Sequence, residues 1–190
     1  ELTGVDTRET LLRALVEQMC DLPGLQIESV WYSFLSYELD DPEYADLDVP
    51  LLYLGSEIEL RFNGADSLYP SWGTNRGWGG GAAFSLHAAR HSHFTSGSLQ
   101  AIDVSLNSAW TNFLHRPITH IAVLGWDGVP NVCRFGFEVG NMYVGTGHRY
   151  IFTDGDDLLV ATEEGWQSQP PPPAETLARL VPTIEGPSTS

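Results

Sequence analysis

Three histidines, His87, His91 and His93, have the spacing in this chain that best fits metal chemistry. All three positions have the same parity, so on a β-strand their side chains would project from one face. Neutral imidazoles that converge on one side can bind zinc, and a further ligand or a water would complete such a site. The candidates for that further ligand are Asp103, His115 and His120.

The surroundings of these histidines argue against a hydrolase. No Glu or Asp lies beside the cluster to act as a general base or to orient an imidazole. On a helix His87 and His91 would align, but His93 would point away. The spacing also differs from the two-histidine helix motif with its glutamate. A zinc-dependent hydrolase built on His87, His91 and His93 is therefore the alternative hypothesis.

Carboxylates gather between positions 38 and 48, and we call residues 37–48 the acidic segment. Like charges packed this closely repel one another, so the segment is either a solvated loop or a surface that docks a basic protein partner. In the second case carboxylates would meet Arg or Lys of the partner, and two tyrosines would anchor it. The members are Tyr37, Glu38, Asp40, Asp41, Glu43, Tyr44, Asp46 and Asp48.

Charge is sorted along the chain, whose formal net charge is −16. Residues 1–60 hold 14 acids and two arginines, whereas residues 61–153 hold four acids and six arginines. All six histidines lie in this middle block, and the chain has no lysine. A field this negative favours a cationic partner and disfavours nucleic acid and anionic lipid. No apolar run approaches the roughly 20 residues of a membrane-spanning helix.

Other routes to catalysis find little support. The glycine-rich stretch 73–82 lacks the preceding strand of a dinucleotide site, and a Walker loop needs a lysine. Cys133 lies with Phe135, Phe137 and Val139 on the apolar face of a strand expected at 131–139, where a thiol behaves as a small hydrophobe. Cys20 and Cys133 form neither a disulfide framework nor a paired metal motif, which favours a reducing compartment. With no signal peptide visible at the start, we expect a cytoplasmic protein.

The expected fold class is α+β. A capping box at Asp6–Glu9 and an apolar stripe predict an N-terminal amphipathic helix. Ser105 begins a short internal helix, whose own apolar stripe runs from Leu106 to Leu114. Strands are expected at 26–34 and at 56–62, where Glu57, Glu59 and Arg61 should face solvent. Turn residues dominate 63–81. Short turns across 118–162 predict an antiparallel β-meander sheet.

The C-terminal part is expected to be a separate tail. Pro170–Pro173 set an extended polyproline stretch that cannot continue a sheet. We therefore predict a single domain over 1–167 and a Pro-rich tail over 168–190 that is mobile. Within the tail, Leu177, Leu180 and Val181 suit one or two amphipathic helical turns.

In size, acidity and lack of a catalytic set, the chain resembles small acidic immunity proteins. This resemblance implies a bacterial protein that neutralises a toxin domain by covering its basic active site. The main hypothesis is accordingly a non-enzymatic binding protein, immunity- or inhibitor-like, with no cofactor. The metal-dependent hydrolase with zinc is the alternative.

Overall fold

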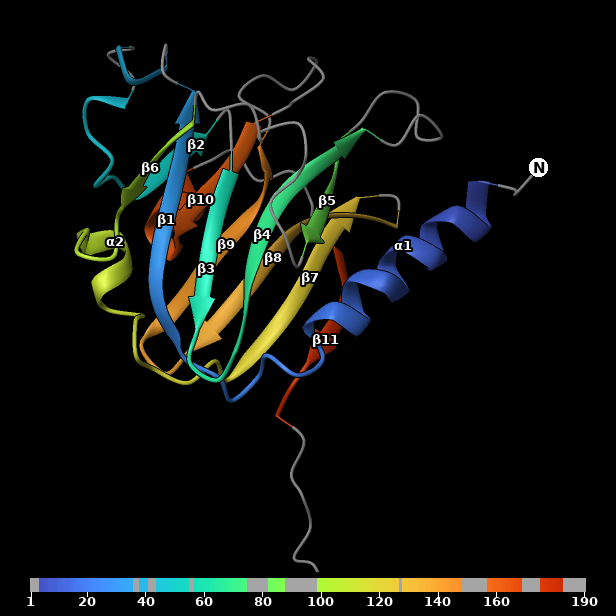
Figure 1. Ribbon diagram of the computed structural model, residues 1–190. Helices are drawn as coiled ribbons and strands as arrows, with labels where there is room; N and C mark the ends of the chain where they lie inside the picture. Colours follow the sequence, from blue (N-terminus) through green and yellow to red (C-terminus); the bar gives the residue numbers. More distant parts are fainter. Residues whose placement is uncertain are drawn as a thin grey trace, which may run out of the picture.

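The computed structural model describes residues 4–35, 38–40, 44–54, 57–74, 82–87, 99–126, 128–147, 157–168 and 175–182. Within these residues, two antiparallel β-sheets pack face to face (Figure 1), and three short helices lie around them. The expected α+β class, with antiparallel sheets, an N-terminal helix and a short internal helix, is confirmed. The structure also contains a second sheet, which packs against the predicted meander.

The first sheet has five strands in the order β5-β4-β3-β1-β6. These strands are β1 (Ile27–Leu35), β3 (Glu57–Phe62), β4 (Ala65–Thr74), β5 (Ala82–His87) and β6 (Leu99–Asp103). β4 occupies most of the stretch that the sequence predicted as turns, so that prediction is wrong. A strand forms there because β4 pairs with β3 on one side and with β5 on the other.

The second sheet has six strands in the order β11-β7-β8-β9-β10-β2. Its central strands are the predicted meander, and β2 and β11 complete its two edges. The strands are β2 (Leu51–Leu54), β7 (His120–Trp126), β8 (Val129–Phe137), β9 (Gly140–Gly147), β10 (Asp157–Thr162) and β11 (Glu175–Leu180). β11 comes from the predicted tail, and it is a strand paired with β7 where helical turns were expected.

The main core lies between the two sheets. Alternate residues of each strand point into it, as the two-residue period of a strand requires. Val30, Tyr32 and Phe34 come from β1, while Phe135 and Phe137 come from β8. A smaller apolar cluster lies on the other side of the six-stranded sheet, around Ala122, Leu124, Val132, Tyr143, Leu159 and Ala161.

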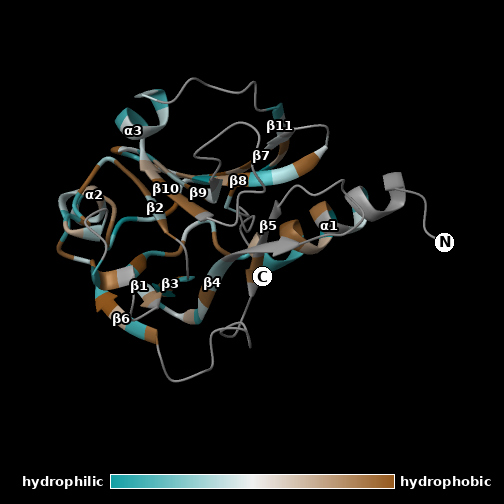
Figure 2. Ribbon diagram, turned by 90° about the horizontal axis from the view of Figure 1, so that it is seen from above, coloured by the Kyte–Doolittle hydropathy of each residue, from teal (hydrophilic) through white to brown (hydrophobic). Residues whose placement is uncertain are grey.

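Helices close two sides of this two-layer arrangement (Figure 2). α1 (Gly4–Met19) packs against β5 of one sheet and against β8 and β11 of the other. The opposite side holds α2 (Ser108–Thr111), where Trp110 donates a hydrogen bond of 2.7 Å to the Tyr32 hydroxyl. α3 (Glu163–Ser168) lies on the outer side of the six-stranded sheet.

Three local expectations need correction. α2 begins after Asn107 and is one turn long, because the Ser105 hydroxyl accepts a hydrogen bond from the Val30 amide instead of capping a helix. Leu106 is 89% exposed, so it does not belong to the apolar stripe. Val139, expected on the inner face of the meander, is 48% exposed because the β8–β9 turn falls on it.

Candidate functional site

The acidic segment is part of the connection that carries the chain from β1 in one sheet to β2 in the other. It begins with a short 3₁₀ helix, η1 (Glu38–Asp40). Apolar side chains within and just after it pack against the main core, namely Leu39, Tyr44, Leu47 and Val49. Tyr44 lies with its ring centroid 5.1 Å from that of Phe34. The described part of the segment is therefore attached to the body of the protein by its apolar residues.

Hydrogen bonds attach the end of the segment to α2. An Asp48 carboxylate oxygen accepts bonds from the Ser108 hydroxyl (2.8 Å) and the Ala109 amide (3.3 Å). The Leu47 carbonyl accepts a bond of 2.9 Å from the Asn107 side chain. The Ser108 hydroxyl is the main reason why the pKa of Asp48 is lowered, although desolvation opposes it. Asp48 thus supplies the helix cap that the sequence assigned to Ser105.

The remaining predicted partner-binding residues fall into three groups. Asp40 and Asp46 are exposed, and Asp46 accepts a bond of 2.9 Å from the Asp48 amide. Glu38 opens η1, but its side chain is not described. Tyr37, Asp41 and Glu43 lie outside the described residues. Asp40, Asp46 and Asp48 therefore face solvent on an anchored backbone, and of these Asp48 is bonded to α2.

The predicted metal cluster falls mostly outside the described part of the chain. His87 ends β5 opposite Tyr69 of β4, but its side chain is not described. His91 and His93 lie outside the described residues altogether. Among the residues that are described, no group of three His, Cys, Asp or Glu side chains is placed to hold a metal ion. The zinc hypothesis stays a prediction of the sequence.

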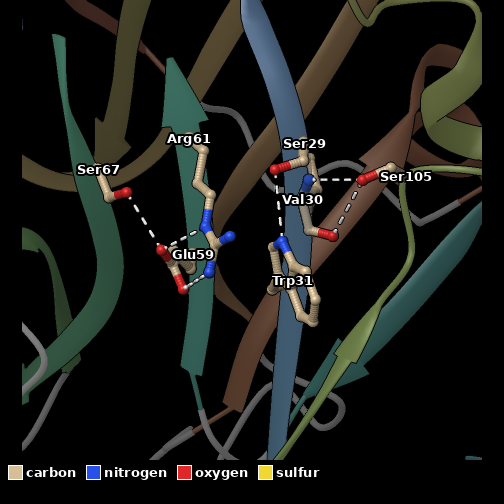
Figure 3. A network of polar contacts seen from close by, with 7 residues as sticks. All are labelled: Ser29, Val30, Trp31, Glu59, Arg61, Ser67 and Ser105. Atoms are coloured by element: carbon tan, nitrogen blue, oxygen red, sulfur yellow. Dashed lines mark hydrogen bonds and ion pairs between the residues drawn. The ribbon is translucent and has the colours of Figure 1, made fainter. Parts of the chain in front are cut away.

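A polar network on the outer side of the five-stranded sheet was missed by the sequence reading. Glu57 and Glu59 were expected to face solvent, but they are 1% and 5% exposed, so this prediction is wrong. Glu59 accepts bonds from Arg61 (2.7 Å) and from the Ser67 hydroxyl (3.1 Å), as Figure 3 shows. Arg61 also stacks on Trp31, with 4.7 Å from its guanidinium carbon to the ring centroid.

The electrostatics of this network favour a charged Glu59. Burial alone would raise the pKa of Glu59, but the bonds from Arg61 and Ser67 outweigh burial and lower the pKa. The Glu-x-Glu-x-Arg spacing of β3 was a signal that these side chains share a face. It did not reveal that two of them, Glu57 and Glu59, are buried. The network stabilises the sheet and leaves Glu59 paired, so it offers no free catalytic acid.

A second network lies on the outer side of the six-stranded sheet. Glu163 accepts bonds from Asn141 (2.8 Å) and from the Tyr143 hydroxyl (2.9 Å). The Tyr143 ring stacks on Trp166 at 4.6 Å and 2°. Burial, followed by the bond to Glu163, raises the pKa of Tyr143 to about 12. Arg134, from the neighbouring strand, lies close enough to affect the pKa of both Tyr143 and Glu163.

Cys133 lies on the buried, apolar face of its strand, as the sequence predicted. Its thiol is fully buried in the main core, 3.6 Å from the Met19 sulfur. Burial raises the pKa of this thiol and so disfavours the thiolate, which is the nucleophilic form. Cys20 is exposed after the end of α1 and is a free thiol.

Comparison with known proteins found no match at any level: no protein family, no curated protein and no solved structure is detectably similar to this chain. In the described part of the chain, no helix is both long and apolar enough to cross a membrane.

Proposed function

We propose that this chain is a non-enzymatic binding protein that docks onto a basic protein partner through the acidic segment. The observation that carries the proposal is the exposure of Asp40 and Asp46 on a backbone that apolar packing holds in place. Carboxylates held in this way lose little conformational entropy on binding. Leu39, Tyr44, Leu47 and Val49 provide this packing, and it keeps the exposed carboxylates at fixed positions on the surface.

The charge of the chain supports the same proposal. With a formal net charge of −16, the protein attracts a cationic partner over long range and raises the rate of encounter. The immunity or inhibitor role is the form of this proposal in which the partner is a toxin domain with a basic active site. Asp48 takes part indirectly, because it holds the end of the segment against α2.

The test removes the exposed carboxylates of Asp40 and Asp46 without changing side-chain size, and it keeps Asp48, which is bonded to α2. We expect the Asp40→Asn/Asp46→Asn variant to lose a cationic partner that the wild-type protein captures from its native cells at low salt. The matched control is Glu9→Gln/Glu17→Gln, which removes two exposed charges from α1 and should keep the partner. Affinity of the wild-type complex should fall as salt rises.

Two results would contradict the proposal. One is that no cationic protein is retained by the wild type under these conditions. The other is that the acidic-segment variant and the α1 variant retain the partner equally well, since only net charge would then matter.

A further inference from the structure

Basic side chains come together on the outer side of the six-stranded sheet, away from the acidic segment in the sequence. Ala122 of β7 is the register partner of Arg134 on β8 and of Arg179 on β11. His120 lies two positions before Ala122 on the same strand, and so on the same face. Residues paired across antiparallel strands project to the same side of the sheet. Arg134, Arg179 and His120 therefore surround Ala122; we call these three residues the basic cluster.

The floor of the basic cluster is made of small residues. Ala122 is fully buried, and Gly136 is the register partner of His120. The imidazole of His120 lies over Gly136, so that a Cβ at this glycine would collide with the ring. The Thr119 hydroxyl lies 3.1 Å from His120 Nδ1, which fixes this nitrogen and leaves Nε2 for another partner.

The charges of the cluster are only partly balanced within the described residues. Arg134 makes a side-chain hydrogen bond with Tyr143, but its Nε is buried and has no hydrogen-bond partner there. Arg179 makes no ion pair with any residue that the structure describes. Glu163 is near Arg134, but its oxygens already accept bonds from Asn141, Tyr143 and Gln167.

We infer that the basic cluster binds a small tetrahedral oxyanion, namely the phosphate group of a phosphate monoester. Two guanidiniums on β8 and β11 and an imidazole on β7 approach from three strands, which suits an acceptor with oxygens in several directions better than a planar carboxylate. A small ligand is favoured over a polyanion, because the net charge of −16 repels nucleic acid from the rest of the surface.

The test uses inorganic phosphate and inorganic sulfate as tetrahedral probes, and acetate as the planar one, at constant ionic strength. The readout is the ring resonances of His120 in NMR spectra of the full chain. We expect phosphate to shift these resonances saturably and to bind more tightly than acetate does. The variant Arg179→Gln should raise the phosphate dissociation constant at least about tenfold, since it removes one charge-assisted donor.

The matched control is Arg13→Gln, which removes an exposed arginine from α1 and should leave phosphate binding unchanged. No saturable shift with phosphate or sulfate in the wild type would overturn the inference. Equal weakening by Arg13→Gln and Arg179→Gln would do so too, because the anion would then respond only to net charge. Acetate binding as tightly as phosphate would overturn the assignment to a tetrahedral ligand. None of these results bears on the acidic segment.

Discussion

The hydroxyl of Tyr32 and the indole of Trp110 form a buried hydrogen bond of 2.7 Å that joins β1 to α2. Both side chains are almost fully buried, and burial raises the pKa of the Tyr32 hydroxyl. A hydrogen bond in such surroundings contributes mainly because its donor would otherwise stay unsatisfied. Tyr32 therefore determines how firmly α2, and with it the contact to Asp48, is held.

The variant Tyr32→Phe tests this contribution. It removes the acceptor and leaves the Trp110 N–H without a partner, so we expect the free energy of unfolding to fall by about 1–3 kcal/mol. Urea unfolding followed by tryptophan fluorescence measures the change. An unchanged unfolding midpoint with the same slope would mean that this bond makes no net contribution.

β11 is a strand although the spacing of its apolar residues is typical of a helix. Leu177 and Leu180 are three residues apart, which favours a helical turn, but a register irregularity between Thr176 and Ala178 breaks the strand alternation. The edge of β7 supplies the hydrogen-bond partners that make the segment a strand. Leu177, Ala178 and Leu180 then pack against the main core.

A pair of neighbouring substitutions tests whether β11 belongs to the sheet. Leu180→Asp places a charge against the core and should lower the free energy of unfolding by about 1–3 kcal/mol. Val181→Asp adds the same charge at a position that is 57% exposed and should have little effect. Thermal unfolding of the two variants measures the difference. Equal stability would favour the mobile tail that the proline run predicted.

β3 gives the opposite lesson, since its strand pattern was correct and its burial was not. Ile58, Leu60 and Phe62 face the core as predicted. Glu57 and Glu59 are buried as well, whereas Arg61, on the same face of β3, is exposed. Alternation identifies the two faces of a strand, but whether the second face is covered depends on strands far away in the sequence.

The molecule combines a large negative charge with a local basic cluster, and both should affect its stability against pH. Burial first, then Arg179 and Arg134, lower the pKa of His120 below its ordinary 6.5. A histidine with a lowered pKa in the folded state contributes stability that is present above pH 6.5 and lost as the pH falls through the folded pKa. The pKa values of Glu59 and Glu163 are also lowered, from an ordinary 4.5. The stability that these two carboxylates contribute is therefore lost only at lower pH, as the pH falls from 4.5 through their folded pKa values.

The variant His120→Gln isolates this effect. In phosphate-free buffer, the wild-type free energy of unfolding should fall between pH 7.5 and 5.5 by more than that of the variant. Every other titrating group is present in both proteins, so its effect cancels in the comparison. Urea unfolding at the two pH values provides the measurement, and identical pH dependence would show that His120 is not under electrostatic strain.

Local patterns were sufficient for α1, β1, β3 and the meander β7–β10, because residue periodicity and turn chemistry act over a few neighbouring residues. The same patterns gave the acidic segment and its charge. Local patterns could not predict the two-layer packing, the edge strands β2 and β11, or the burial of Glu57 and Glu59. The basic cluster is the clearest case, because His120, Arg134 and Arg179 meet only through strand register. Pairing between distant strands is fixed by burial and hydrogen bonding summed over the entire fold, and no short stretch of sequence carries that sum.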